Sequence, residues 1–239
     1  MFIGQQVLPN VLGYPAIEAG LAVLPAAALM VMCAPLSARL IVARGARVTL
    51  LTGYGFVLLG FLVMLLVWRD GVGYWAIALG YGLVGAGVGF AGTPASHSLT
   101  NSVPVTRAGM ASGTADLQRD LRGAIMQSIL GLLLTAGYAR SFAAQIAASS
   151  EATKVTENVQ AMLVRSLASA ENIAKKYPEY ADAIEKAARE SFLVGQDWAY
   201  IAGVIAVVLG AALVFFVFPK RERESELFTK YQLEDRVGE

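Results

Sequence analysis

Charge is scarce in this 239-residue sequence, because only 15% of its residues are charged while 56% are hydrophobic. The formal net charge is +1, which argues against the broad basic surface that nucleic-acid-binding proteins use to neutralise phosphates. So small a charged fraction is atypical of a soluble domain of this length. The composition therefore predicts a membrane protein with several spanning helices and no nucleic-acid partner.

Cysteine and histidine are almost absent, with one residue of each type, Cys33 and His97. A single cysteine excludes an intramolecular disulfide, and the sequence has no CxxC, HExxH or Cys/His cluster. No group of residues resembles a nucleophile with a base and an orienting partner. We therefore expect no metal, no cofactor and no enzymatic activity.

Basic residues are missing from the start of the sequence, where none precedes Arg39. The basic region and cleavage site of a secretory signal peptide are not recognisable there, so membrane insertion is expected to depend on internal apolar runs. A helix needs about 20 apolar residues to cross the hydrocarbon core. Five runs reach or approach this length, at residues 19–40, 48–68, 74–96, 115–138 and 198–218.

The basic residues predict the orientation of these runs, since cytoplasmic loops are enriched in lysine and arginine. Arginines follow the first and third runs, and basic residues begin the tail of residues 219–239, so these parts are expected in the cytoplasm. The loop between the second and third runs has Arg69 offset by Asp70, and it is expected outside with the N-terminus. Residues 1–140 would form a membrane region with four spans, followed by an outer segment and the last span.

The outer segment, residues 141–197, is rich in alanine, glutamate, lysine and serine. Apolar residues recur there in two series at helical spacing, before and after Pro178, which predicts an extracytoplasmic helical hairpin. The series are Val155, Val159, Met162, Leu163, Leu167, Ala170 and Ile173, then Ala183, Ile184, Ala187 and Phe192. A solvated cap that packs on itself is favoured over a partner-binding module, and a catalytic domain is least favoured.

Glycine is concentrated in the third run, which reads "LGYGLVGAGVGFAGTP". Small residues let membrane helices approach closely, so the pattern favours tight or sliding helix packing, with lining of a substrate path as the alternative. The candidates for helix packing are Gly80, Gly82, Gly85, Gly89, Gly92 and Pro94.

Acids and bases alternate at the start of the fourth run, in "TADLQRDLRGA". They lie three or four residues apart, so they can pair along one helix. A charge at the bilayer centre costs about 2.5–3.5 kcal/mol on insertion scales, which favours a position at the inner interface. Structural pairing is favoured, with gating of the inner mouth and proton carriage by an aspartate as alternatives. The inner-face candidates are Arg39, Arg47, Arg107, Asp116, Arg119 and Asp120.

His97, in "TPASHSL", is expected to form a hydrogen bond near the interface, with a proton relay as the weaker alternative. No acid lies between Glu18 and Asp70, or between Asp70 and Asp116. A proton-coupled carrier usually needs a titratable group buried at mid-depth in the membrane. If the protein uses protons, the coupling site is therefore expected in sequence that this chain does not contain.

Three stretches carry a resemblance to a known family. They are "QQVLPNVLGYPAIEAGLAVLPAAALMVMCAPLSARL", "GVGFAGTPASHSLTNSVPVTRAGMASGTADLQRDLRGAIMQSILG" and "FFVFPKRE". Together they resemble the C-terminal part of the major facilitator superfamily, specifically the fourteen-span drug:proton antiporters of the multidrug exporter type. The most specific element is VPxxRAGxASG, which begins at Val103. The sequence departs from the family at Ala38 and Arg122, where glycine is usual, and at Val42, where aspartate is usual.

The resemblance implies an exporter that exchanges small amphipathic compounds for protons across the bacterial plasma membrane. The family has two six-helix bundles and two linking spans, of which this chain would supply the last five helices, with "MFIGQQVLPNVLGY" as the end of a preceding span. Transport is then expected to require a complementing half-transporter as well as the lipid bilayer. Arg107 and Arg119 are implied to steady the closed inner face. The alternative is a standalone membrane interaction protein that binds a partner through its hairpin.

Overall fold

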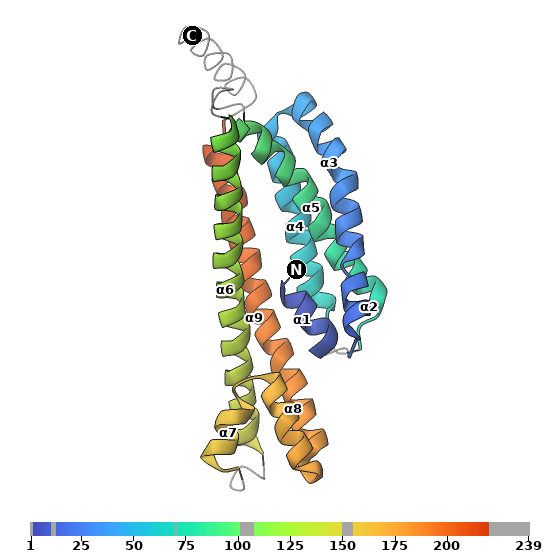
Figure 1. The fold of residues 1–239 in the computed structure, drawn as a ribbon, viewed down its shortest axis with the longest axis vertical. Coiled ribbons are helices and arrows are strands. Elements are labelled where there is room, and N and C mark those ends of the chain that lie inside the picture. Colours follow the sequence, from blue (N-terminus) through green and yellow to red (C-terminus); the bar gives the residue numbers. More distant parts are fainter. Residues whose placement is uncertain (1, 11–12, 70, 101–107, 150–154, 220–239) are drawn as a thin grey trace. The chain divides into compact units, whose positions relative to one another are not determined.

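The computed structural model describes residues 2–10, 13–69, 71–100, 108–149 and 155–219, and these form helices and connecting turns without a strand. Figure 1 shows these helices, coloured along the chain. The helices are α1 (Phe2–Asn10), α2 (Ala16–Leu21), α3 (Leu24–Arg44), α4 (Ala46–Val67), α5 (Tyr74–Thr100), α6 (Ala108–Ala148), α7 (Glu157–Leu163), α8 (Leu167–Lys176), the 3-10 helix η3 (Pro178–Tyr180) and α9 (Ala181–Val217).

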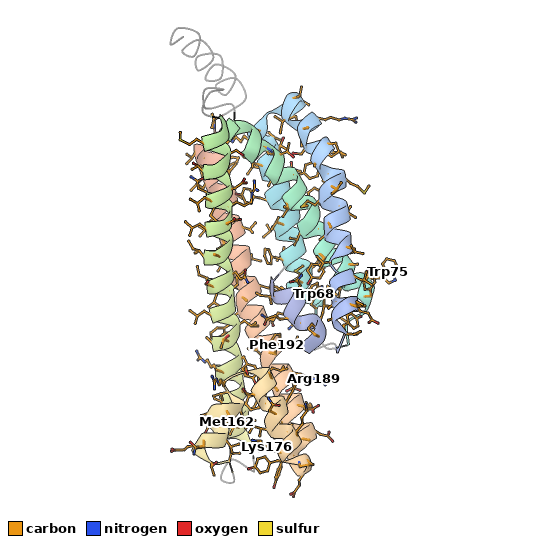
Figure 2. The ribbon with its side chains drawn as sticks, viewed as in Figure 1. Trp68, Trp75, Met162, Lys176, Arg189 and Phe192 are labelled. Atoms are coloured by element: carbon orange, nitrogen blue, oxygen red, sulfur yellow. The ribbon has the colours of Figure 1, made fainter. Side chains whose placement is uncertain are left out.

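Five helical stretches in the described residues are long and apolar enough to cross a membrane. They are Ala16–Arg44, Ala46–Val67, Tyr74–Pro94, Gly109–Ala148 and Pro178–Val217. The expected apolar runs lie within or overlap these stretches, and the all-helical fold class with five membrane-length helices is confirmed. Trp75, at the start of α5, is 83% exposed and points away from its helix, as is common for aromatic residues at a membrane interface (Figure 2).

Two helices are much longer than the apolar runs that they contain. α6 has 41 residues and α9 has 37, whereas a helix of about 20 residues already spans the hydrocarbon core. At 1.5 Å per residue these helices are about 55–60 Å long, roughly twice the hydrocarbon thickness. Alanine, arginine and glutamine after the apolar run of α6, and alanine, glutamate and lysine before that of α9, are good helix formers, so both helices continue past their runs.

The segment expected as a separate hairpin, residues 141–197, therefore differs from the expectation in its boundaries. Its first residues continue α6, and residues 181–197 are the first turns of α9. Two short helices, α7 and α8, contact each other and lie between these long helices in the sequence. Residues 150–154 of this segment and the tail 220–239 lie outside the described residues.

The chain divides into two compact units. One contains α3, most of α4, α5, the start of α6 and the end of α9. Within it, Ser37 of α3 donates a 2.9 Å hydrogen bond to the carbonyl oxygen of Phe90 in α5. The Phe90 ring also stacks on Phe56 of α4, with 5.6 Å between the ring centroids. α5 therefore contacts both α3 and α4.

The other unit contains α1, α2, the end of α4, the second half of α6, α7, α8 and the first half of α9. α6 and α9 pack against each other where Gly137 faces Gly195. Closer to the C-terminal end of α6 and the N-terminal end of α9, Gln145 donates a 3.1 Å hydrogen bond to the Ser191 hydroxyl. Tyr138 donates a 2.9 Å hydrogen bond to the carbonyl oxygen of Leu163, which fixes α7 against α6.

The α6–α9 contact predicts an unusual cost for a glycine-to-alanine change. A methyl group at Gly195 would collide with the Leu134 carbonyl oxygen and lie 3.0 Å from the Tyr138 nitrogen. Gly195→Ala is expected to lower stability by about 1–3 kcal/mol, although alanine is the better helix former. Gly123→Ala, where nothing lies within 4 Å, is the matched control and should be neutral or stabilising. Thermal unfolding of both variants in detergent, followed by circular dichroism, checks this; equal midpoints would contradict the close contact.

Candidate functional site

Three glycines of α5 form one side of a close contact with α3. A methyl group at Gly85 would collide with the carbonyl oxygen of Ala26, and one at Gly89 would lie 2.6 Å from the carbonyl oxygen of Met30. At Gly82 it would lie 2.9 Å from Cδ1 of Leu29. The three- and four-residue spacing places these glycines on one face of the helix. α3 and α5 therefore approach each other backbone to backbone at Gly85 and Gly89, whereas α5 meets the Leu29 side chain at Gly82.

A second close contact joins α4 to a different face of α5. A methyl group at Gly53 of α4 would lie 2.8 Å from the Gly87 carbonyl oxygen, and one at Gly60 would lie 3.2 Å from the Gly80 carbonyl oxygen. The sequence analysis did not single out Gly53 and Gly60. Their seven-residue spacing, which places them on the same face two turns apart, is the signal that could have found them. α5 is thus packed closely on two sides.

The remaining candidates in α5 are placed differently. Gly92 has nothing within 4 Å of its Cβ position, so it makes no such contact. Pro94 is fully buried within α5. His97 lies on the same helix, but its side chain is outside the described residues.

Of the inner-face charges, Asp116 and Arg119 are brought together in a 3.0 Å ion pair three residues apart on α6. Both side chains are more than 60% exposed, so the pair contributes little to stability. Asp120 and Arg39 are exposed and form no ion pair with a described residue. Arg107 lies outside the described residues.

Arg47, the other inner-face arginine, is only partly exposed and contacts α9. Its guanidinium group lies 4.9 Å from the centroid of the Phe215 ring and donates a hydrogen bond to the Phe215 carbonyl oxygen. An arginine beside the last carbonyls of a helix is favourable, because it binds acceptors that have no partner within the helix. Arg47 therefore joins the start of α4 to the end of α9.

A polar cluster at the end of α4 was not anticipated. Arg69 forms a 2.8 Å ion pair with Asp197 of α9, whereas the sequence analysis set Arg69 against its neighbour Asp70, which lies outside the described residues. Gln196 is fully buried and lies 3.4 Å from the Trp68 carbonyl oxygen, to which its amide donates. The Trp68 ring meets the Tyr200 ring edge-on at 6.2 Å. No pattern in the sequence links residues 128 positions apart.

The contacts of these elements are close helix packing through glycine and ion pairs near helix ends. The described parts of the chain contain no group of three or more metal-ligating side chains. Asp197 directly precedes the apolar run that begins at Trp198, so the Arg69–Asp197 pair lies at the N-terminal boundary of this run. Helices packed through glycine can shift along each other without rearranging large side chains, and charged pairs at their ends can hold one arrangement.

Comparison with known proteins shows a partial similarity to a multidrug resistance protein. The chain is 35% identical over 136 residues to two proteins called multidrug resistance protein Stp, from Mycobacterium tuberculosis strains CDC 1551 and H37Rv. The match covers 57% of this chain and 25% of each relative, so the chain spans about a quarter of the length of these curated relatives. The chain matches no family model.

The α3–α5 contact can be tested with the native cysteine. The Cβ position of Gly89 lies 3.0 Å from Cβ of Cys33, slightly closer than in a disulfide. Gly89→Cys is therefore expected to cross-link to Cys33 under mild oxidation after a small shift of the two helices. Gly92→Cys, on the open side of α5, should stay unlinked. Cleavage at the exposed Arg44 between the two cysteines provides the measurement, because only a cross-linked chain keeps its fragments together until reduction. Separate fragments from oxidised Gly89→Cys would contradict the contact.

The Arg69–Asp197 pair predicts a charge-dependent effect. Arg69→Asp places two acids together, and it is expected to lower stability by up to about 1 kcal/mol, the range of partly exposed ion pairs. Adding Asp197→Arg restores opposite charges and should recover part of the loss. Unfolding by SDS in mixed micelles gives the midpoints of the single and double variants. A double variant less stable than both single variants would show that the pair does not form.

Proposed function

We propose that this chain is part of a membrane transporter of the multidrug-efflux type. The observation that carries the proposal is the 35% identity to the Stp multidrug resistance proteins over 136 residues. Five helices of membrane length support it, as does the packing of α5 against α3 and α4 through glycine. We infer that the complete machine exports small amphipathic compounds in exchange for protons, as the resemblance to drug:proton antiporters implies.

In this proposal the chain acts as part of one helical bundle that rocks against another. The contacts of Gly85 and Gly89 with α3 would let α5 shift, because backbone surfaces slide without interlocking. Arg119, with Arg107 nearby in sequence, would hold the inner face in its closed arrangement. Transport would require helices corresponding to the part of the relatives that the match does not cover.

The proposed position in the bacterial plasma membrane follows from the distribution of charge. Arg39, Arg47 and the residues around Arg119 would face the cytoplasm, with the C-terminal tail. The N-terminus and the segment 141–197 would lie on the outer side. Tyr74 and Trp75, whose rings contact edge-on at 5.9 Å, would lie at the outer interface, where aromatic side chains are enriched.

The acids of the described chain also bear on proton coupling. Asp116 is paired and exposed, Asp120 is exposed, and Asp197 is paired with Arg69 at the end of an apolar run. A coupling acid needs to be buried at mid-depth, where its proton affinity can change with the conformation. We therefore place the coupling site in the complementing helices rather than in this chain.

A chimeric transporter tests the proposal. The 136 matched residues of the Stp protein are replaced by those of this chain, and efflux of a fluorescent amphipathic dye is measured in a bacterial strain without its own exporters. The chimera is expected to export the dye, whereas this chain alone is expected to export none. Blots of membrane fractions control for the amount of protein. A chimera that is present in the membrane at the parent level but exports nothing would contradict the function, and efflux by this chain alone would contradict the need for complementing helices.

A further inference from the structure

A cavity of about 400 Å³ lies in the unit that contains the second half of α6 and the first half of α9. It is lined by residues of α6, α7, α8, η3 and α9. Its innermost side chains, Phe142, Leu163 and Ile173, come from three different helices and are 2%, 3% and 5% exposed. Tyr177 and Ala183 are exposed at its rim. The cavity therefore has an apolar floor and an opening to its surroundings.

The walls of this cavity are held in place by hydrogen bonds that do not involve a ligand. Tyr138 ties the end of α7 to α6 through the carbonyl oxygen of Leu163, and its ring contacts that of Phe142. On the other side, Gln145 of α6 donates to Ser191 of α9. These bonds are made by residues of the walls with each other, so the space between them does not depend on a ligand to stay open.

The lining indicates the chemistry of a ligand. None of the described lining residues is charged, although acids and bases are frequent elsewhere on α8 and at the start of α9. The rings of Phe142, Tyr177 and Tyr180 provide apolar surface, and Gln145 adds a neutral hydrogen-bonding group. The volume lies within the range of about 300–1,000 Å³ that is typical of small-molecule sites. A charged ligand would lose its hydration here without gaining an opposite charge from any of the described lining residues.

The surroundings of the cavity distinguish it from a gap between membrane-spanning helices. The residues of α8 and the first turns of α9 include Glu171, Lys175, Asp182, Glu185 and Arg189, a density of charge that hydrocarbon does not accommodate. Figure 2 shows Met162, Lys176 and Arg189 in this same part of the unit. The cavity is therefore an apolar site within a polar helical cap, where a hydrophobic molecule leaving water gains most from burial.

We propose that this cavity is a binding site for a small, uncharged, mainly apolar molecule that carries one or two neutral hydrogen-bonding groups. The floor of Phe142, Leu163 and Ile173 takes its apolar part, and Tyr177 and Tyr180 orient its polar end, because the amide nitrogen of Gln145 already donates to Ser191 and Ala187. The site is separate from the glycine contacts of α5. Binding does not require that the chain transport anything, so the proposal stands or falls independently of efflux.

Photochemical labelling of the full chain in lipid nanodiscs tests the site. The probe is an uncharged aryl trifluoromethyl diazirine with a terminal alkyne, and the competitor is the same aryl compound without the diazirine. Mass spectrometry of peptides from α8 and the start of α9 is expected to show saturable labelling that the competitor removes. Labelling of these peptides that rises in proportion to probe concentration, as in lipid-exposed helices, would overturn the proposal.

A matched pair of variants identifies the cavity as the place of binding. Ala187→Phe fills the cavity, and it is expected to lower the saturable labelling by about tenfold, the effect of an ordinary steric clash on affinity. Ala168→Phe adds the same ring to an exposed position of α8 outside the lining, and it should leave the labelling unchanged. If Ala187→Phe loses its helical circular dichroism spectrum, Ala183→Phe at the exposed rim replaces it. An equal loss in the filling variant and in Ala168→Phe would overturn the assignment.

A charged competitor tests the chemical class. The same aryl compound with a trimethylammonium group should displace the probe at least about tenfold more weakly, because the described lining residues offer it no acid. Displacement by the cation at the concentration that suffices for the neutral compound would overturn the assignment to an uncharged ligand.

Discussion

The unit of α3, α4 and α5 depends on the close approach of helix backbones. In lipid, apolar side chains gain nothing by leaving one hydrocarbon environment for another, so helices associate through contact between atoms at short range. Glycine permits this on two faces of α5, where Gly85 and Gly89 meet the backbone of α3 and Gly87 meets α4. Side chains larger than hydrogen at these positions would push the helices apart, and the contacts that join them would be lost.

The second unit is held together by a different combination of interactions. Gly137 and Gly195 bring α6 and α9 together, but beyond them the contacts are hydrogen bonds between side chains and to backbone, such as those of Tyr138 and Gln145. This change follows the length of the helices, because both extend far beyond what the hydrocarbon core can contain. At the proposed position outside hydrocarbon, polar contacts compete with water and apolar burial again favours packing, which agrees with the buried floor of Phe142 and Ile173.

The sequence was most informative where a residue pattern is compatible with few structures. A long apolar run can form few structures other than a membrane helix, so the five helices of membrane length could be predicted. Glycines at four-residue spacing in one helix predicted close packing, and the structure places Gly85 and Gly89 against α3. The partners of such contacts are not encoded locally. Gly53 and Gly60 are more widely spaced in α4, and the Arg69–Asp197 pair joins residues 128 positions apart.

Helix boundaries were predicted less well for the same reason. Loss of hydrophobicity marks where a run leaves the hydrocarbon, but it does not mark where a helix ends, since alanine, glutamate and lysine continue it. The sequence thus located residues 141–197 outside the apolar pattern, although the structure divides them among α6, α7, α8, η3 and α9.

The charged start of α6 connects the structure with the proposed transporter. Met110, Leu117 and Leu121 are more than half exposed there, and Asp116, Arg119 and Asp120 are exposed among them. An exposed apolar surface favours lipid, whereas charges exposed to hydrocarbon cost about 2.5–3.5 kcal/mol each on insertion scales. Both conditions are met at once where a helix crosses the interface, or where its polar side faces further protein. In the proposed transporter these turns of α6 would lie at the inner mouth, and the charges that suit the interface would also hold this mouth closed.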